Sequence, residues 1–86
     1  MKIKEGFILR EASGCYCVMY LGGELQFNGM ITLNETGAFI WRAIEKGLSI
    51  EEIIKAICNE YEISYQQASN DFEIFLSKMR GAQIIE

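Results

Sequence analysis

The segment that most constrains the fold of this chain is residues 29–41, in which a short apolar strand leads directly into a helix. Residues 30–33 are of types that suit a pleated, half-buried strand. Asn34 follows at once, and we expect its side chain to cap the helix by accepting a hydrogen bond from the backbone amide of Thr36 or Gly37. A strand joined to a helix through a single capping residue is held in a fixed orientation against that helix.

Two further strands are predicted before this segment. Residues 7–11 and 15–20 are rich in branched and aromatic side chains, and the loop between them contains a glycine that can adopt a positive φ. The third strand is expected to run from about residue 27 or 29 to residue 33. Because connections this short favour antiparallel pairing, the sequence predicts a three-stranded antiparallel sheet.

Three helices are predicted after the sheet. The first is expected over residues 35–46 and should stop at Gly47. The second begins at Ser49, which together with Glu52 has the pattern of a capping box. Its apolar residues have the clearest helical period in the chain, and they are Ile50, Ile53, Ile54, Ile57, Cys58 and Tyr61. This helix should therefore place one continuous stripe against the core.

The third helix is predicted to begin at Ser64, with Gln67 completing a second capping box, and to end near Gly81. Its apolar face consists of Tyr65, Ala68, Phe72, Phe75, Leu76 and Met79. Residues 82–85 are expected to form a terminal turn or a short strand. The fold class that follows is α+β, with a three-stranded antiparallel sheet followed by a three-helix bundle. The last two helices form a helix-turn-helix arrangement beside the strands, in a single domain of residues 1–86.

The composition excludes several classes of protein. The 86 residues carry a net charge of −4, which disfavours a phosphate backbone, so no nucleic-acid partner is expected. The start of the chain lacks the apolar run of a secretory signal. No segment approaches the ~20 apolar residues that cross a bilayer. We therefore expect a cytoplasmic protein without a membrane partner.

The residues that usually carry chemistry are scarce. Cys15, Cys17 and Cys58 form no Cys-x-x-Cys pair, and the chain has no histidine, so zinc would need an uncommon ligand set. We interpret the cysteines as small buried packing residues and predict neither a metal site nor a cofactor. Because the chain also lacks a nucleophile motif, a phosphate-binding glycine loop and a histidine base, we do not expect an enzyme.

Three binding functions remain open. The helix-turn-helix geometry suggests recognition of DNA by the third helix, although Asp71 and Glu73 in its middle would face phosphate. An open strand edge can instead accept an extended peptide as an additional strand. The same edge can pair with a second copy of the chain to form a homodimer.

For peptide recognition, the candidate strand consists of Gly29, Met30, Ile31, Thr32 and Leu33. The last helix would supply the opposite wall through Phe75 and Met79, whereas Phe72 and Leu76 are expected in the core. Ile74 lies off the apolar stripe and is a candidate for an exposed contact. The predicted site therefore lies between the third strand and the third helix.

Several runs of the sequence match a known family. They are Leu33-Asn34-Glu35-Thr36-Gly37-Ala38-Phe39-Ile40-Trp41, followed by Gly47, residues 49–54, Tyr61 and residues 71–76. In these runs the chain resembles the family of pyrroloquinoline quinone biosynthesis protein D. The pattern Leu-Asn-x-Thr-Gly-x-x-Ile-Trp is more specific than the helical periods, and the resemblance extends from about Phe7 to Ile85.

The resemblance implies a winged helix-turn-helix-like fold that recognises the leader of a ribosomally made precursor peptide. Family members bind the leader between the third strand and the third helix and present it to a modifying enzyme, often a radical S-adenosylmethionine enzyme. The positions implied here are Met30, Ile31, Thr32 and Leu33 on the strand, and Asp71, Phe75, Lys78 and Met79 on the helix. Residues 22–28 and Gln83 depart from the family pattern, which favours a member that serves a different peptide system.

Overall fold

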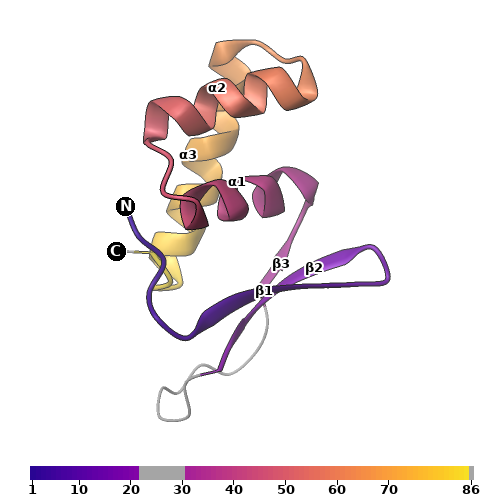
Figure 1. Cartoon of the computed structure of the whole chain (residues 1–86), viewed down its shortest axis with the longest axis vertical. Coiled ribbons are helices and arrows are strands. Elements are labelled where there is room, and N and C mark those ends of the chain that lie inside the picture. Colours follow the sequence, from indigo (N-terminus) through magenta and orange to yellow (C-terminus); the bar gives the residue numbers. More distant parts are fainter. Residues whose placement is uncertain (22–30, 86) are drawn as a thin grey trace.

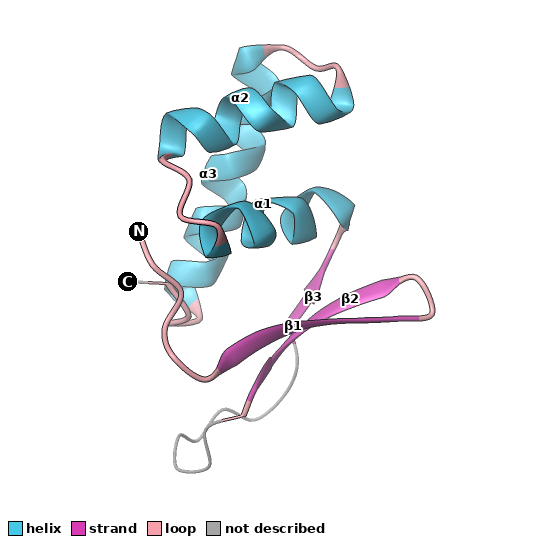
Figure 2. Cartoon of the chain, in the orientation of Figure 1, coloured by secondary structure: helices cyan, strands magenta, loops and turns pink. Residues whose placement is uncertain are grey.

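The computed structural model describes residues 1–21 and 31–85 of the chain. In this part of the chain three strands precede three helices (Figures 1 and 2), and they are β1 (Phe7–Ala12), β2 (Cys15–Tyr20), β3 (Ile31–Leu33), α1 (Glu35–Glu45), α2 (Ile50–Tyr61) and α3 (Tyr65–Gly81). This order confirms the predicted α+β fold. The predicted start of the third strand, before residue 31, lies outside the described residues.

β1 and β2 form an antiparallel hairpin in which Phe7 faces Tyr20 and Ala12 faces Cys15. The two residues of the turn, Ser13 and Gly14, have φ angles of 53° and 78°. Two-residue turns of type I′ require positive φ at both positions, because that geometry matches the right-handed twist of the flanking strands. The glycine predicted for this turn therefore has a conformational role.

β3 pairs antiparallel with β2 on the side opposite β1, which gives the strand order β1-β2-β3. In this register Val18 faces Ile31 and Tyr16 faces Leu33. β3 is therefore an edge strand of the sheet, and Figure 1 shows it leading from the sheet to α1.

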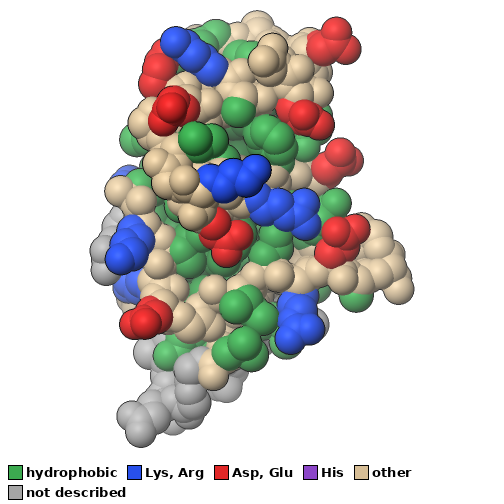
Figure 3. Space-filling view, in the orientation of Figure 1, with side chains coloured by type: hydrophobic (Ala, Val, Ile, Leu, Met, Phe, Trp, Pro, Cys, Tyr) green, Lys and Arg blue, Asp and Glu red, His purple; other side chains and the backbone are tan. Residues whose placement is uncertain are grey.

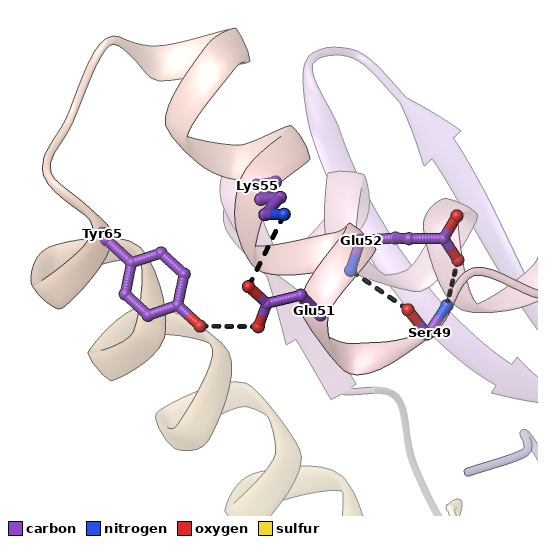
Figure 4. A network of polar contacts seen from close by, with 5 residues as sticks. All are labelled: Ser49, Glu51, Glu52, Lys55 and Tyr65. Atoms are coloured by element: carbon purple, nitrogen blue, oxygen red, sulfur yellow. Dashed lines mark hydrogen bonds and ion pairs between the residues drawn. The ribbon is translucent and has the colours of Figure 1, made fainter.

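α2 begins with the predicted capping box (Figure 4). The Ser49 hydroxyl accepts a hydrogen bond from the Glu52 amide at 3.2 Å, and the Glu52 carboxylate accepts one from the Ser49 amide at 2.9 Å. Ile53 and Ile57 are buried as predicted, but Ile50, predicted for the same face, is 46% exposed. The apolar stripe extends one turn beyond the part of α2 that packs on the core.

α3 begins at Ser64, whose hydroxyl accepts a hydrogen bond from the Gln67 amide at 3.1 Å. The Gln67 side chain donates to Asp71 at 3.0 Å instead of completing the predicted capping box. Tyr65, predicted for the apolar face, is 49% exposed because its hydroxyl donates to Glu51 of α2 at 2.8 Å (Figure 4). This hydrogen bond to a carboxylate raises the pKa of Tyr65 and joins the two helices at the surface.

The core lies between the helices and the sheet. Among the described residues, the largest fully buried side chains are Trp41, Phe72, Ile40, Ile53, Ile57, Met79, Ile84 and Val18. Leu33 of β3 belongs to the same buried cluster as these residues. Because one cluster includes residues of β2, β3 and all three helices, the position of α3 relative to β3 is fixed by packing.

The two ends of the described chain lie side by side (Figure 1). Ile3 forms an isolated antiparallel bridge with Ile85, and the Lys4 amide donates to the Ile84 carbonyl at 2.8 Å. Both Ile84 and Ile85 are buried. These contacts confirm the predicted turn or short strand at residues 82–85, and they tie the end of α3 to the segment that leads into β1.

The cysteines differ in part from their predicted burial. Cys15 is exposed beside the hairpin turn, whereas Cys17 and Cys58 are partly buried, and all three are free thiols. Over residues 1–21 and 31–85, no cluster of three or more His, Cys, Asp or Glu residues is suited to holding a metal ion. In the same ranges, no helix combines the length and apolar character needed to span a bilayer.

The capping box of α2 predicts a pH dependence of stability. The hydrogen bond that the Ser49 backbone amide donates to the Glu52 carboxylate, together with one from the Ser49 side chain, lowers the pKa of Glu52 below its ordinary value of 4.5. Because the folded-state pKa is the lower one, this stabilisation is fully present above pH 4.5 and is lost as pH falls through the folded-state value. We expect the urea midpoint of the wild type to fall more between about pH 5 and 3 than that of Glu52→Gln. Parallel curves for the two proteins would contradict this assignment.

Candidate functional site

A single residue joins β3 to α1 and sets the direction of the strand. The Asn34 side chain accepts a hydrogen bond from the Gly37 amide at 2.8 Å, which is one of the two predicted caps. The Asn34 carbonyl accepts a hydrogen bond from the Ala38 amide at 3.0 Å. A Cβ atom at Gly37 would lie 3.3 Å from the Leu33 Cβ, so glycine allows the first turn of α1 to approach the end of β3 closely.

The backbone of Thr32 points away from the sheet. The Leu21 amide donates to the Gly6 carbonyl at 2.8 Å, so the odd-numbered residues of β2 direct their backbone groups toward β1. The even-numbered residues of β2 therefore bond to β3, through Ile31 and Leu33. Thr32 lies between these two residues, and both its N–H and its C=O face outward.

α3 lies beside this outer edge of β3. The Lys78 ammonium donates to the Thr32 carbonyl at 3.0 Å, between residues 46 positions apart. This contact independently indicates that the Thr32 carbonyl faces α3 rather than β2. Lysine side chains commonly protect the edges of natural sheets from pairing with other chains, and Lys78 occupies such a position.

A groove with a volume of about 490 Å³ lies between β3 and α3. From α3 it is lined by Asp71, Ile74, Phe75 and Lys78, whose spacing of i, i+3, i+4 and i+7 places them on one face of the helix. The remaining lining residues belong to β3, α1 and their junction, and they are Thr32, Leu33, Asn34, Thr36, Gly37 and Ile40. An edge strand, the start of one helix and the face of another therefore enclose one groove.

The middle of the groove is apolar and its ends are charged. Ile74 is 69% exposed, whereas its neighbour Phe75 is buried and presents only a small surface. Ile74 therefore supplies most of the accessible apolar surface that α3 contributes to the groove. Asp71 lies toward the start of α3 and accepts the hydrogen bond from Gln67, while Lys78 lies two turns further along the helix.

The structure brings together five of the nine predicted site residues. Those lining the groove are Thr32, Leu33, Asp71, Phe75 and Lys78. Ile31 is partly buried in β3 and does not line it. Gly29 and Met30 lie outside the described residues. Met79, predicted for the wall of the groove, is instead fully buried in the core, because one further step along α3 turns the side chain by about 100° from Lys78.

Sequence reasoning did not assign the contributions of α1 to the groove. Asn34, Thr36, Gly37 and Ile40 line it because the Asn34 cap holds the start of α1 against the end of β3. A helical stripe drawn from Asp71 rather than from the core residues would have selected Ile74 in place of Met79. The sequence around Asn34 and the spacing from Asp71 to Ile74 therefore carried the relevant local patterns. Only the packing of α3 shows which of its stripes faces β3.

Comparisons with known proteins agree with this arrangement. A family model described as Coenzyme PQQ synthesis protein D (PqqD) matches residues 8–85. Among solved structures, the chain is similar to TbiB1 in complex with the TbiA(beta) leader peptide, with 27% sequence identity and a TM-score of 0.83. The match covers 100% of this chain and 95% of that chain. Comparison with curated proteins gives no match.

Proposed function

The chain belongs to the PqqD family, and we propose that it is a non-catalytic adaptor that binds the leader of a ribosomally made precursor peptide and presents it to a modifying enzyme. The observation that carries this proposal is the outward-facing backbone of Thr32 beside the groove between β3 and α3. An extended peptide can add to β3 as a fourth strand and place alternate side chains in the groove. The similarity to TbiB1, a protein solved with a leader peptide, supports a leader peptide as the ligand.

Backbone pairing along the described part of β3 supplies only part of the affinity that a leader needs. Within the described part of β3, only Thr32 presents backbone groups to a new strand, which gives two hydrogen bonds of about 1 kcal/mol each. Micromolar binding requires about 8 kcal/mol after the costs of association. Apolar peptide side chains packed against Ile74 and Phe75, worth about 1.5–3 kcal/mol for each one fully buried, must therefore supply much of the remainder.

The proposed partner enzyme follows from family membership. We propose a radical S-adenosylmethionine enzyme or another peptide-modifying enzyme, to which the adaptor delivers the leader while the rest of the precursor remains free to react. The groove itself offers only Asp71 and Lys78 as ionisable side chains among the described residues, which suits recognition better than acid–base chemistry. The whole domain, residues 1–86, would act as one recognition unit.

Two other binding modes are less well supported. Recognition of DNA by α3 would need a basic face, yet α3 carries Asp71 in the groove and Glu73 among its exposed residues. On the other side of the molecule, where α1 and α2 lie in front, Figure 3 shows Lys and Arg interspersed with Asp and Glu. A second copy of the chain can pair with β3, but it would then occupy the leader site. Light scattering with and without bound peptide separates self-association from leader binding.

Amide chemical shifts test the proposal. Isotope-labelled protein is titrated with synthetic leaders taken from small reading frames beside its gene, and with scrambled versions as controls. We expect a cognate leader to shift the amides of Ile31–Leu33 and those between Asp71 and Lys78, and the scrambled peptide to leave them unchanged. Leaders that shift neither set, or that act only on distant surfaces, would count against the adaptor function.

A further inference from the structure

The α3 side of the groove has a charge order. Asp71 and Lys78 line its two ends, with Ile74 and Phe75 between them. Seven residues of helix place the two Cα atoms about 10.5 Å apart along the axis. The ion pairs found among the described residues do not include one between Asp71 and Lys78, so each charge is available to a ligand.

The Lys78 ammonium lies where a strand added to β3 would dock. It donates to the Thr32 carbonyl, which is the acceptor that the amide of an added strand would use. A carbonyl oxygen has two lone pairs, so the ammonium and that amide can share it. A docked peptide therefore lies beside the ammonium, whose remaining donors can bind a carboxylate of the peptide.

Asp71, at the other end of this face of α3, needs a hydrogen-bond donor from the peptide. Its carboxylate accepts one hydrogen bond, from the Gln67 amide group, and it is partly buried at the other end of the groove. A carboxylate can accept several hydrogen bonds, so capacity remains for a donor from the peptide. A lysine or arginine of the peptide fits this end, because a charge-assisted hydrogen bond is stronger than one between neutral groups.

We infer that the groove selects extended peptides by charge order, with an acidic side chain at Lys78, a basic side chain at Asp71 and an apolar side chain between them. This inference rests on the proposed function. Side chains on one face of a strand recur every two residues, and four residues span about 13 Å. The Lys78 side chain is long enough to bridge the difference between this span and the spacing of Asp71 and Lys78 along α3. The acidic and basic residues of the peptide are therefore four positions apart, and the apolar residue lies midway between them, against Ile74 and Phe75.

Selection from a random peptide library displayed on phage tests this inference. The wild type and Lys78→Glu are panned in parallel, and Arg80→Glu is the matched control, since Arg80 is exposed on the same helix, does not line the groove and gives the same change of net charge. The second pair is Asp71→Lys with its control Glu73→Lys, which is likewise exposed and outside the groove. Thr32→Pro identifies the peptides that depend on β3.

We expect peptides from the wild-type selection to carry an acidic and a basic residue four positions apart around an apolar one. Lys78→Glu should weaken such a peptide by about tenfold, and a lysine in place of its acidic residue should restore binding. Arg80→Glu should leave binding within about twofold. Peptides that need β3 but ignore charge at both ends would overturn the charge rule and leave the adaptor function standing. Failure to select any peptide that depends on β3 would overturn both.

Discussion

Replacement of Phe72 with alanine should lower the free energy of unfolding by about 3–5 kcal/mol. Phe72 is fully buried on α3, within the cluster that joins this helix to α1, α2 and the sheet. Removing the ring loses its transfer free energy and leaves a cavity that the packed surroundings fill only in part. Since small domains are stable by about 5–15 kcal/mol, a loss of this size is a large share of the total. Denaturation in urea, monitored by circular dichroism, measures it.

Ile74→Ala is the matched control for this substitution. Ile74 lies two positions further along α3 but is 69% exposed, so its truncation should change stability by less than about 0.5 kcal/mol. The same change removes apolar surface from the groove and should weaken leader binding while the fold remains intact. Equal losses of stability in the two variants would show that the packing face of α3 has been assigned incorrectly.

Thr32→Pro should weaken leader binding by about 5- to 150-fold while the domain remains folded. Proline removes the Thr32 N–H, which faces outward and makes no bond to β2 in the register described above. Proline is tolerated on edge strands when its N–H side faces solvent, and the preceding residue, Ile31, is already extended as proline requires. A docked peptide would lose the hydrogen bond from the Thr32 N–H, and the peptide carbonyl that accepted it would be left unpaired. Together these two effects cost about 1–3 kcal/mol. Isothermal titration with a cognate leader measures the loss.

Thr32→Val is the control for the proline variant. Valine keeps the backbone N–H and the branched side chain that suits a strand, so it should bind the leader within about twofold of the wild type. Thermal unfolding of both variants checks that the sheet persists. The account fails if Thr32→Pro folds normally and binds the leader as tightly as Thr32→Val does.

Local sequence signals were sufficient for the elements and their caps. The strands at residues 7–11 and 15–20 were predicted to within one residue, because branched residues bounded by glycine and turn residues define a hairpin without tertiary context. The caps at Asn34 and Ser49 were predicted because they depend only on residues three positions ahead. The position of the candidate site between β3 and α3 came instead from the family resemblance.

The parts that were missed depend on packing between distant elements. The predicted apolar face of α3 began with Tyr65, but a hydrogen bond to Glu51 on α2 holds that residue at the surface. The Gln67 side chain could have accepted a hydrogen bond from the Ser64 amide and completed a capping box. It donates instead to the Asp71 carboxylate, one turn later in α3. The contact of Lys78 with Thr32 joins residues 46 positions apart, so no local pattern could have revealed it.

Hydrogen exchange at the Thr32 amide tests the central claim most directly. In the free protein this amide should exchange much faster than those of Ile31 and Leu33, which bond to β2. A bound leader should slow exchange at Thr32 at least tenfold and change its two neighbours little. A Thr32 amide that is already as protected as its neighbours without peptide, or that stays fast in a saturated complex, would contradict docking of the leader as a strand on β3.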